Sequence, residues 1–235
     1  MEKKILTIIP ARGGSKTIPH KNIKNLCGKP LIAWTINNAL ECEYLDRIVV
    51  STDDLQISKI SKEFGAEVPF LRPNKIAEDD SPTIDAIIHS LDFLENNGYH
   101  PEIVVLLQPT SPLRTAQDIE SALNLFFEYE KTCSAVVSVS EFDHSPYLSL
   151  KIEKGYLKPN FGEEYFNKRR QDLPQLYKPN GSIYISTPNN IRKFGGFFGN
   201  KIVPYKMPQE RSVDIDTITD FKLAELMLGE LNEIY

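Results

Sequence analysis

The chain has few cysteines and no long apolar run. Its 235 residues include only Cys27, Cys42 and Cys133, which form no C-x-x-C pair and have no histidine at metal-ligand spacing. Such scattered thiols favour buried structural positions over a metal or redox centre. The first apolar stretch, residues 5–9, is too short for a signal peptide, and no run approaches the roughly 20 apolar residues of a membrane span. We therefore expect a cytoplasmic protein with no membrane partner.

Several well-known site motifs are also missing. The chain has no G-x-x-x-x-G-K-[ST] loop, which excludes a P-loop, and no G-x-G-x-x-G, which disfavours a dinucleotide oxidoreductase. It has no nucleophile elbow of a serine hydrolase. The four histidines show no metal spacing, so ordinary core or surface roles are expected for His20, His89, His100 and His144.

The net charge is mildly negative but unevenly distributed. With 27 Lys and Arg against 32 Asp and Glu, the formal charge of -5 disfavours a broad nucleic-acid footprint. Residues 1–30 nevertheless carry seven Lys or Arg against one acid, Glu2. A local positive pocket in an acidic protein points to a small anionic ligand.

The first 140 residues alternate between strand-like and helix-like segments. Apolar runs typical of buried strands lie at 5–9, 47–51, 103–107 and 135–139, with a short strand also expected at 67–71. Helical spacing of apolar residues marks 30–42, 55–64, 83–96 and 118–129. Repeated βα units predict an α/β fold, a Rossmann-like doubly wound and mostly parallel sheet with helices on both faces.

The alternation breaks after about residue 141. Residues 142–182 are rich in Pro, Tyr, Asn and charge, with weak period-2 segments around 147–152. This insertion is too long for an ordinary loop and too polar for a second core, so a surface lobe, a mobile lid and a dimerisation arm all stay open. Strands at 182–186 and 201–205 and a helix at 219–231 then follow. We therefore expect a core made of 1–141 and 183–235.

The most informative stretch is 8–22, which reads I-I-P-A-R-G-G-S-K-T-I-P-H-K-N. It places Arg12, Lys16 and Lys21 around two glycines where the first strand ends. Glycines let backbone N–H groups approach phosphates, and cations neutralise phosphate charge. This loop predicts a nucleoside triphosphate site.

Other polar clusters follow later strands, at the sheet edge where open parallel sheets bind ligands. They are S-T-D-D at 51–54, which could equally be a helix cap, and Q-P-T-S-P-L-R at 108–114, which could be a rigid turn. Asp214 and Asp216 lie on the same side of an extended segment, or are solvated surface acids. Because paired carboxylates repel one another unless a cation relieves them, Mg²⁺ is the natural partner beside a triphosphate.

Seven ordered blocks of sequence resemble one known family. They are P-A-R-G-G-S-K at 10–16, I-P-H-K-N-I at 18–23, G-K-P-L-I at 28–32, V-V-S-T-D-D at 49–54, L-L-Q-P-T-S-P-L-R at 106–114, N-G-S-I-Y-I at 180–185 and S-V-D-I-D-T at 212–217. Together they resemble the acylneuraminate cytidylyltransferases, also called CMP-sialic acid synthetases. The match runs from about residue 5 to 225.

The resemblance implies a nucleotidyltransferase that converts CTP and a nine-carbon 2-keto sugar acid into a CMP-nonulosonate and pyrophosphate. The 2-hydroxyl of the sugar would attack the α-phosphorus in line. Such a step depends on positioning and charge stabilisation, so cations and Mg²⁺, or another divalent ion such as Mn²⁺, are the implied cofactors.

The resemblance also implies roles for particular residues. Nucleotide contacts fall to Ala11, Arg12, Gly13, Ser15, Lys16, Lys21, Asn22, Arg72 and Ser81. Sugar contacts fall to Gln108, Arg170 and Tyr184. Metal ligation falls to Asp214 and Asp216, and catalytic roles to Arg12, Lys16, Lys21 and Asp216.

Family members are similar to one another in forming homodimers whose inserted arm reaches the neighbouring active site. This implies that residues 142–182 place Arg170 on the partner's sugar carboxylate, where a guanidinium fork fits well. The adjacent Arg169, one residue earlier, is the alternative for this role.

One departure from the best-known sialate enzymes bears on the sugar. Those enzymes tend to carry a lysine where this chain has Leu148, so sialic and legionaminic acid are held level as substrates and pseudaminic acid third. A synthetase for the eight-carbon acid Kdo and a non-catalytic nucleotide-binding protein are further alternatives. Arg170 and the long arm argue against Kdo, and Lys21 with the aspartate pair argues against the non-catalytic reading.

Overall fold

The structure is a computed structural model that describes residues 3–233, with the side chains described up to residue 229. A six-stranded sheet forms its centre, in the order β10-β6-β9-β5-β1-β4. The strands are β1 (Ile5–Pro10), β4 (Arg47–Ser51), β5 (Ile103–Leu107), β6 (Ala135–Glu141), β9 (Tyr177–Ser186) and β10 (Ile202–Lys206). Only β9 runs antiparallel to its neighbours, so the predicted mostly parallel sheet is confirmed.

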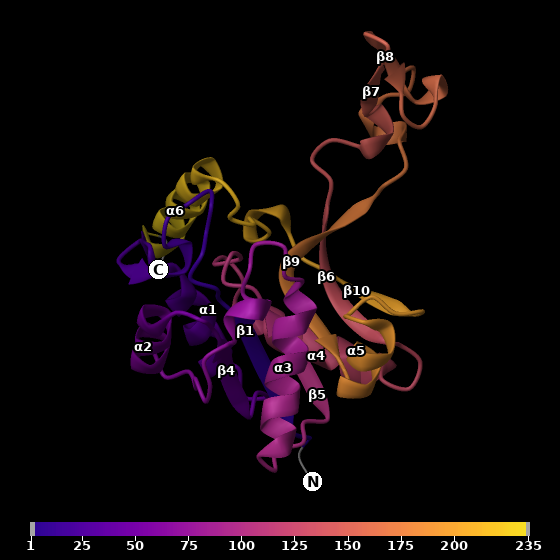
Figure 1. The fold of residues 1–235 in the computed structure, drawn as a ribbon. Coiled ribbons are helices and arrows are strands. Elements are labelled where there is room, and N and C mark those ends of the chain that lie inside the picture. The colour runs from indigo at the N-terminus through magenta and orange to yellow at the C-terminus, as the bar shows by residue number, and fades with distance from the viewer. Residues whose placement is uncertain (1–2, 234–235) are drawn as a thin grey trace.

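Helices cover both faces of the sheet because its strands are apolar on both sides (Figure 1). In β1, Ile5 and Ile9 pack with α1 (Leu31–Leu40), α2 (Leu55–Glu63) and α4 (Ala116–Tyr129). Leu6 and Ile8 face the other way, toward α3 (Thr83–Asn96) and α5 (Pro188–Phe194). This alternation of neighbours follows the period-2 geometry of a strand and confirms the doubly wound fold.

A third apolar cluster lies beyond the carboxyl ends of the strands. Phe221, Ala224 and Leu228 of α6 (Ile218–Glu233) pack there against Ile18, Leu26, Leu31, Leu113 and Ile215. The short hairpin of β2 (Asn25–Leu26) and β3 (Lys29–Pro30) joins this cluster. The cluster therefore ties together the basic loop, the Q-P-T-S-P-L-R loop and the segment between Asp214 and Asp216.

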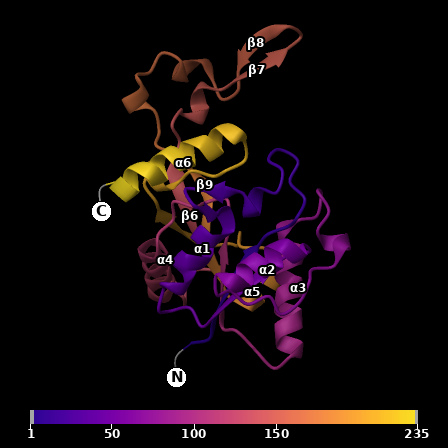
Figure 2. The same cartoon turned by 90° about the vertical axis from the view of Figure 1, so that its left-hand side faces the viewer.

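Residues 142–176 form an arm that projects from the core in both views (Figures 1 and 2). The arm joins the ends of β6 and β9 and carries the hairpin of β7 (Leu150–Glu153) and β8 (Tyr156–Pro159). Large apolar side chains are exposed on it, among them Ile152 at 76%, Tyr156 at 74% and Leu157 at 66%.

Some predicted elements were wrong in extent. The strand expected at 182–186 begins at Tyr177, and the strand expected at 67–71 is a single bridge between Val49 and Glu67. Helix α5 had not been predicted. Part of the period-2 segment at 147–152 is a short 3-10 helix, Pro146–Leu148, that precedes β7. Within residues 3–233, no helix has the length and apolar character needed to cross a membrane.

Candidate active site

A cavity of about 290 Å³ opens at the carboxyl ends of β1, β4 and β5. Six of the predicted site residues line it: Arg12, Lys21, Asn22, Arg72, Ser81 and Gln108. They come from five separate parts of the chain and meet because parallel strands end at one edge of the sheet.

Backbone contacts hold the basic loop in place at the end of β1. Ala11 N–H donates to the Ser51 carbonyl at 2.9 Å, and Gly13 N–H donates to Asp53 Oδ1 at 3.0 Å. A Cβ on Gly13 would lie 2.8 Å from Asp54 Oδ2, so close approach requires glycine here. Asp54 accepts from the N–H groups of Gln56 and Ile57, which confirms the helix-cap interpretation for this residue.

Two of the predicted phosphate-binding cations are paired with one carboxylate, Asp79. Arg12 lies 3.0 Å from Asp79 and also donates to the Glu78 carbonyl at 2.9 Å, while Lys16 Nζ lies 2.7 Å from Asp79. The hydrogen bond from Lys16, with the positive charge of Arg12, lowers the pKa of Asp79. Asp79 therefore carries its negative charge where the prediction puts the phosphates.

Arg72 supplies a buried positive charge on the wall of the cavity. Its guanidinium donates to the Ser51 hydroxyl at 3.2 Å and to the Ser51 carbonyl, and the residue is 7% exposed. Burial lowers its pKa, the charge of Asp53 opposes that effect and Arg12 adds to it. An anion entering the cavity would relieve this crowding of positive charge.

Lys21 joins the basic loop to the aspartate pair. Its ammonium group donates to the Ile215 carbonyl at 2.8 Å and lies 3.7 Å from Asp216 Oδ1. Ile215 is fully buried while Asp214 and Asp216 are exposed, so the two carboxylates lie on the same side as predicted. Although part of Asp214 is exposed to solvent, its carboxyl group is partly dehydrated, which raises its pKa, and repulsion from Asp216 adds to the shift.

Gly181 lies beside one predicted sugar-site residue, Gln108, and one predicted metal ligand, Asp214. Its φ of +75° favours glycine, and a Cβ there would lie 2.7 Å from Gln108 Oε1 and 3.0 Å from Asp214 Oδ2. Tyr184 follows on β9, packed against Phe197. Burial and the nearby charge of Asp214 raise the pKa of Tyr184. Gln108, Tyr184 and Asp214 therefore form one end of the site.

The remaining predicted residues lie apart from this cavity within a single chain. Arg169 and Arg170 are exposed on the arm, where Arg170 donates to the Asp143 carbonyl. Leu148 is also on the arm, 38% exposed. Ser15 is half-buried in the basic loop. The sugar role of Arg170 thus stays a prediction that requires a second chain.

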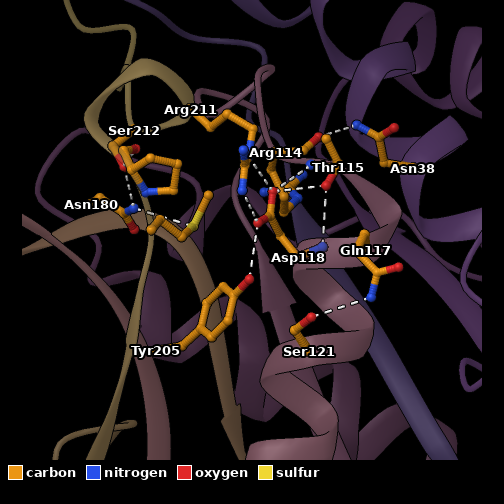
Figure 3. Close-up of polar contacts among 12 residues, drawn as sticks. Asn38, Arg114, Thr115, Gln117, Asp118, Ser121, Asn180, Tyr205, Arg211 and Ser212 are labelled. Atoms are coloured by element: carbon orange, nitrogen blue, oxygen red, sulfur yellow. Dashed lines mark hydrogen bonds and ion pairs between the residues drawn. The ribbon is translucent and has the colours of Figure 1, made fainter.

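Two buried charges near the site had not been predicted as functional. Arg114 is 1% exposed and donates to the Ser182 carbonyl at 2.8 Å, and burial lowers its pKa to about 9. Asp118 in α4 is paired with Arg211 (Figure 3). Arg114 is the last residue of the Q-P-T-S-P-L-R motif, and its place in that motif could have marked it as functional. No sequence pattern could have indicated the pair of Asp118 and Arg211, because the two residues lie far apart in the sequence.

A doubly wound α/β sheet with clustered cations, glycines and an aspartate pair at its carboxyl edge defines a nucleotidyltransferase type of protein. A family model described as Cytidylyltransferase matches residues 6–235. The chain belongs to this cytidylyltransferase family and is a nucleotidyltransferase, which confirms the resemblance drawn from the motif blocks.

Curated relatives match over nearly the whole chain. A CMP-N,N'-diacetyllegionaminic acid synthase of Legionella pneumophila is 38% identical over 98% of this chain and 98% of its own length. An N-acylneuraminate cytidylyltransferase of Escherichia coli is 36% identical over 95% of this chain, which spans 52% of that protein. A pseudaminic acid cytidylyltransferase of Campylobacter jejuni is 30% identical over 95% and 96% of the two chains.

Solved structures of low sequence identity share the fold. A CMP:2-keto-3-deoxy-manno-octonic acid synthetase complexed with CTP has a TM-score of 0.72 at 16% identity, covering 97% of this chain and 100% of that one. A 4-diphosphocytidyl-2C-methyl-D-erythritol synthase from Anaerococcus prevotii has a TM-score of 0.66 at 13% identity, with the same coverage. These likenesses support the fold class of the core.

Proposed function

We propose that this enzyme makes a CMP-nonulosonate and pyrophosphate from CTP and a nine-carbon 2-keto sugar acid, in the cytoplasm. The observation that carries the proposal is one cavity with a cationic end at Arg12, Lys21 and Arg72 and a polar end at Gln108. Relatives with full-length matches bear names of such synthases. The cationic end suits a triphosphate and the polar end suits a hydroxylated sugar.

At the nucleotide end, the chain supplies charge and backbone donors. Arg12 and Lys16 leave Asp79 to contact the phosphates, and Asn22, whose amide donates to the Arg12 carbonyl at 2.9 Å, keeps the loop in register. Lys21 lies between the loop and Asp216, so it neutralises charge that develops as pyrophosphate departs. Chemistry of this kind depends on fixed positive groups more than on a side-chain nucleophile.

The aspartate pair fits a divalent cation of the Mg²⁺ type. Two carboxylates that face one way, with the charge of Asp216 helping to raise the pKa of Asp214, are the donor set that Mg²⁺ completes with phosphate oxygens and water. Residues 3–229 hold no group of three or more His, Cys, Asp or Glu side chains arranged for a metal, so the phosphates would have to supply ligands. Asp214 and Asp216 would hold the Mg²⁺ ion. Bound there, it would withdraw negative charge from the triphosphate.

The sugar end is completed by a second copy of the chain in our proposal. Within a single chain Arg170 is exposed and donates to the Asp143 carbonyl, and the large apolar residues of the arm face solvent. A C2 dimer would let each arm reach its partner's cavity and bring Arg170 to the sugar carboxylate. Residues Ile152, Tyr156 and Leu157 would then be covered by the partner.

Among the sugars, we favour a legionaminic acid over sialic acid. The legionaminic acid synthase is 38% identical over 98% of this chain, against 36% over 95% for the sialate enzyme. Leu148 supplies an apolar side chain where a charged one would suit a more hydroxylated sugar. Leu148→Lys should shift kcat/KM toward sialic acid, and an unchanged preference would argue against this assignment.

A panel assay tests the proposed reaction. Protein with CTP and Mg²⁺ is incubated separately with legionaminic, sialic and pseudaminic acid and with Kdo, and pyrophosphate release is followed. We expect release with at least one nine-carbon acid and none with Kdo.

A mixing experiment tests the dimeric site. Lys21→Ala has an intact arm and Arg170→Ala has an intact core, so each variant alone should be inactive. After unfolding and refolding an equal mixture, about one quarter of wild-type activity should return, because half of the dimers then contain one intact site. No recovery in a mixture that is folded and dimeric would contradict the shared site.

A further inference from the structure

An ion pair with a buried carboxylate lies beside the segment that leads into the aspartate pair. The Asp118 carboxylate is 2% exposed and accepts from Arg211 Nε at 3.0 Å and Nη2 at 2.8 Å. The Tyr205 hydroxyl donates to it at 3.0 Å, and the Thr115 N–H and hydroxyl donate at 3.0 and 2.9 Å (Figure 3). None of these four residues is among those proposed to contact the nucleotide or the sugar.

Asp118 is a rigid anchor for Arg211. It is the N3 residue of a capping box with Thr115 at the start of α4, and α4 packs on the sheet through Ile119 and Leu123. Burial alone would raise the pKa of Asp118, but the bonds from Arg211 and Thr115 outweigh burial and lower it. The carboxylate therefore stays charged at neutral pH and holds the guanidinium by two parallel bonds.

The next residue in the chain has its own anchor on a different element. The Ser212 hydroxyl accepts from Asn180 Nδ2 at 3.0 Å and donates to the Pro208 carbonyl at 2.7 Å. Asn180 is 3% exposed and is itself fixed by the Ser138 hydroxyl at 2.6 Å. Arg211 and Ser212 are thus held by α4 and β9, respectively (Figure 3).

The aspartate pair begins two residues after these anchors. Beyond it the chain is held again, since Ile215 N–H donates to the Thr110 carbonyl at 2.9 Å. Asp214 therefore lies on a span of only two residues between fixed points at 212 and 215. The position of residue 212 depends on both the Arg211 and the Ser212 contacts, and a shift there would be transmitted directly to Asp214, because so short a span cannot absorb it.

We propose that Arg211 is a positioning residue that, through its pair with Asp118, sets the backbone from which Asp214 and Asp216 hold a divalent cation. This inference rests on the proposed function, in which those carboxylates bind the metal. Arg211 itself touches no substrate. Its effect should appear in metal affinity more than in CTP affinity, as for outer groups that orient metal ligands.

The test uses Arg211→Gln, Ser212→Ala and a matched control, Arg192→Gln. Arg192 is 34% exposed against 36% for Arg211 and likewise bonds carboxylates, at 2.6 Å to Asp92 and 2.9 Å to Glu95. It joins α5 to α3 away from the aspartate pair. Mn²⁺ binding to each full-length protein with CTP and no sugar is measured from the spectroscopic signal of free Mn²⁺, together with Tm, kcat and KM.

We expect Arg211→Gln to weaken Mn²⁺ binding about tenfold, with KM for CTP at saturating Mg²⁺ changed less than about threefold. Ser212→Ala should weaken Mn²⁺ binding in the same direction by a smaller factor, and Arg192→Gln should leave it unchanged. Arg211→Lys keeps the positive charge but loses the two parallel bonds of the guanidinium. Its Mn²⁺ affinity should lie between those of Arg211→Gln and the wild-type protein.

Wild-type Mn²⁺ affinity in folded Arg211→Gln would overturn the inference, whatever its Tm. If Arg211→Gln does not fold, Arg211→Lys decides, and wild-type Mn²⁺ affinity in that variant would overturn the inference too. Failure of the proposed function is separate: it would appear as wild-type protein that binds Mn²⁺ with CTP yet releases no pyrophosphate with any sugar.

Discussion

Gly181→Ala is the substitution for which the structure predicts the sharpest separation between stability and activity. Gly181 has φ of +75°, and its missing side chain leaves room for Gln108 and Asp214. The left-handed conformation costs an alanine about 1–2 kcal/mol, and the smaller entropy of the unfolded alanine chain offsets about 0.4–1 kcal/mol of that. The net loss of stability is about 1 kcal/mol, which lowers Tm by about 2–4 °C in a protein of this size.

The effect on activity should be far larger. The new Cβ would lie 2.7 Å from Gln108 Oε1 and 3.0 Å from Asp214 Oδ2, so both side chains must move. They are flexible at their ends, and the fold therefore survives, but a misplacement of about 1 Å at a reacting site can cost about 100-fold in rate. We expect kcat/KM for the sugar to fall by about that factor.

Gly98→Ala is the matched control for the backbone strain. Gly98 has φ of +84° and open space around its Cβ position, and it follows the end of α3 remote from the cavity. Its Tm should fall as in Gly181→Ala while its kcat/KM stays at the wild-type value. Activity within about threefold of wild type in Gly181→Ala, at the expected Tm, would refute the arrangement of Gln108 and Asp214 around Gly181.

Two further predictions concern single carboxylates. Asp79→Asn should tighten CTP binding a few-fold in calorimetry, because Asp79 competes with phosphate for Arg12 and Lys16; weaker binding would contradict that competition. Asp214→Asn should abolish activity yet raise Tm at pH 7, because the raised pKa of Asp214 means that folding disfavours its charged form. That gain should shrink as the pH falls through the raised pKa of the folded protein and vanish below the ordinary value of about 3.9; a lower Tm at pH 7 would contradict it.

Two kinds of element were predicted best from the sequence. They are strands that are apolar throughout because helices pack on both of their faces, and helices with a clear 3.6-residue spacing of apolar residues. β4, β5 and α3 begin and end where predicted, since continuous apolar runs and a 3.6-residue spacing have few other solutions. The first half of β9 was not predicted, because Pro179 and Gly181 are residue types that usually interrupt a strand. Pro179 is tolerated since it pairs with Val139 of β6 beside a register shift, beyond the part of β9 that pairs with β5.

The residues of the candidate site likewise include some that could be predicted from the sequence and some that could not. Arg12, Lys21 and Gln108 were predictable because each directly follows a strand or its loop, and parallel strands deliver such residues to one edge. Asp79 and the pair of Asp118 with Arg211 were not, because their partners lie at least 63 residues away in sequence and only the packed fold brings them together.

The central claim is the transfer of CMP from CTP to a nine-carbon sugar acid, and mass spectrometry of the product tests it most directly. Wild-type protein with CTP, Mg²⁺ and a legionaminic acid should give a CMP-sugar of the mass expected for loss of pyrophosphate. The product should be absent with Lys21→Ala. Wild-type protein that leaves CTP and every nine-carbon acid of the panel unchanged would contradict the claim.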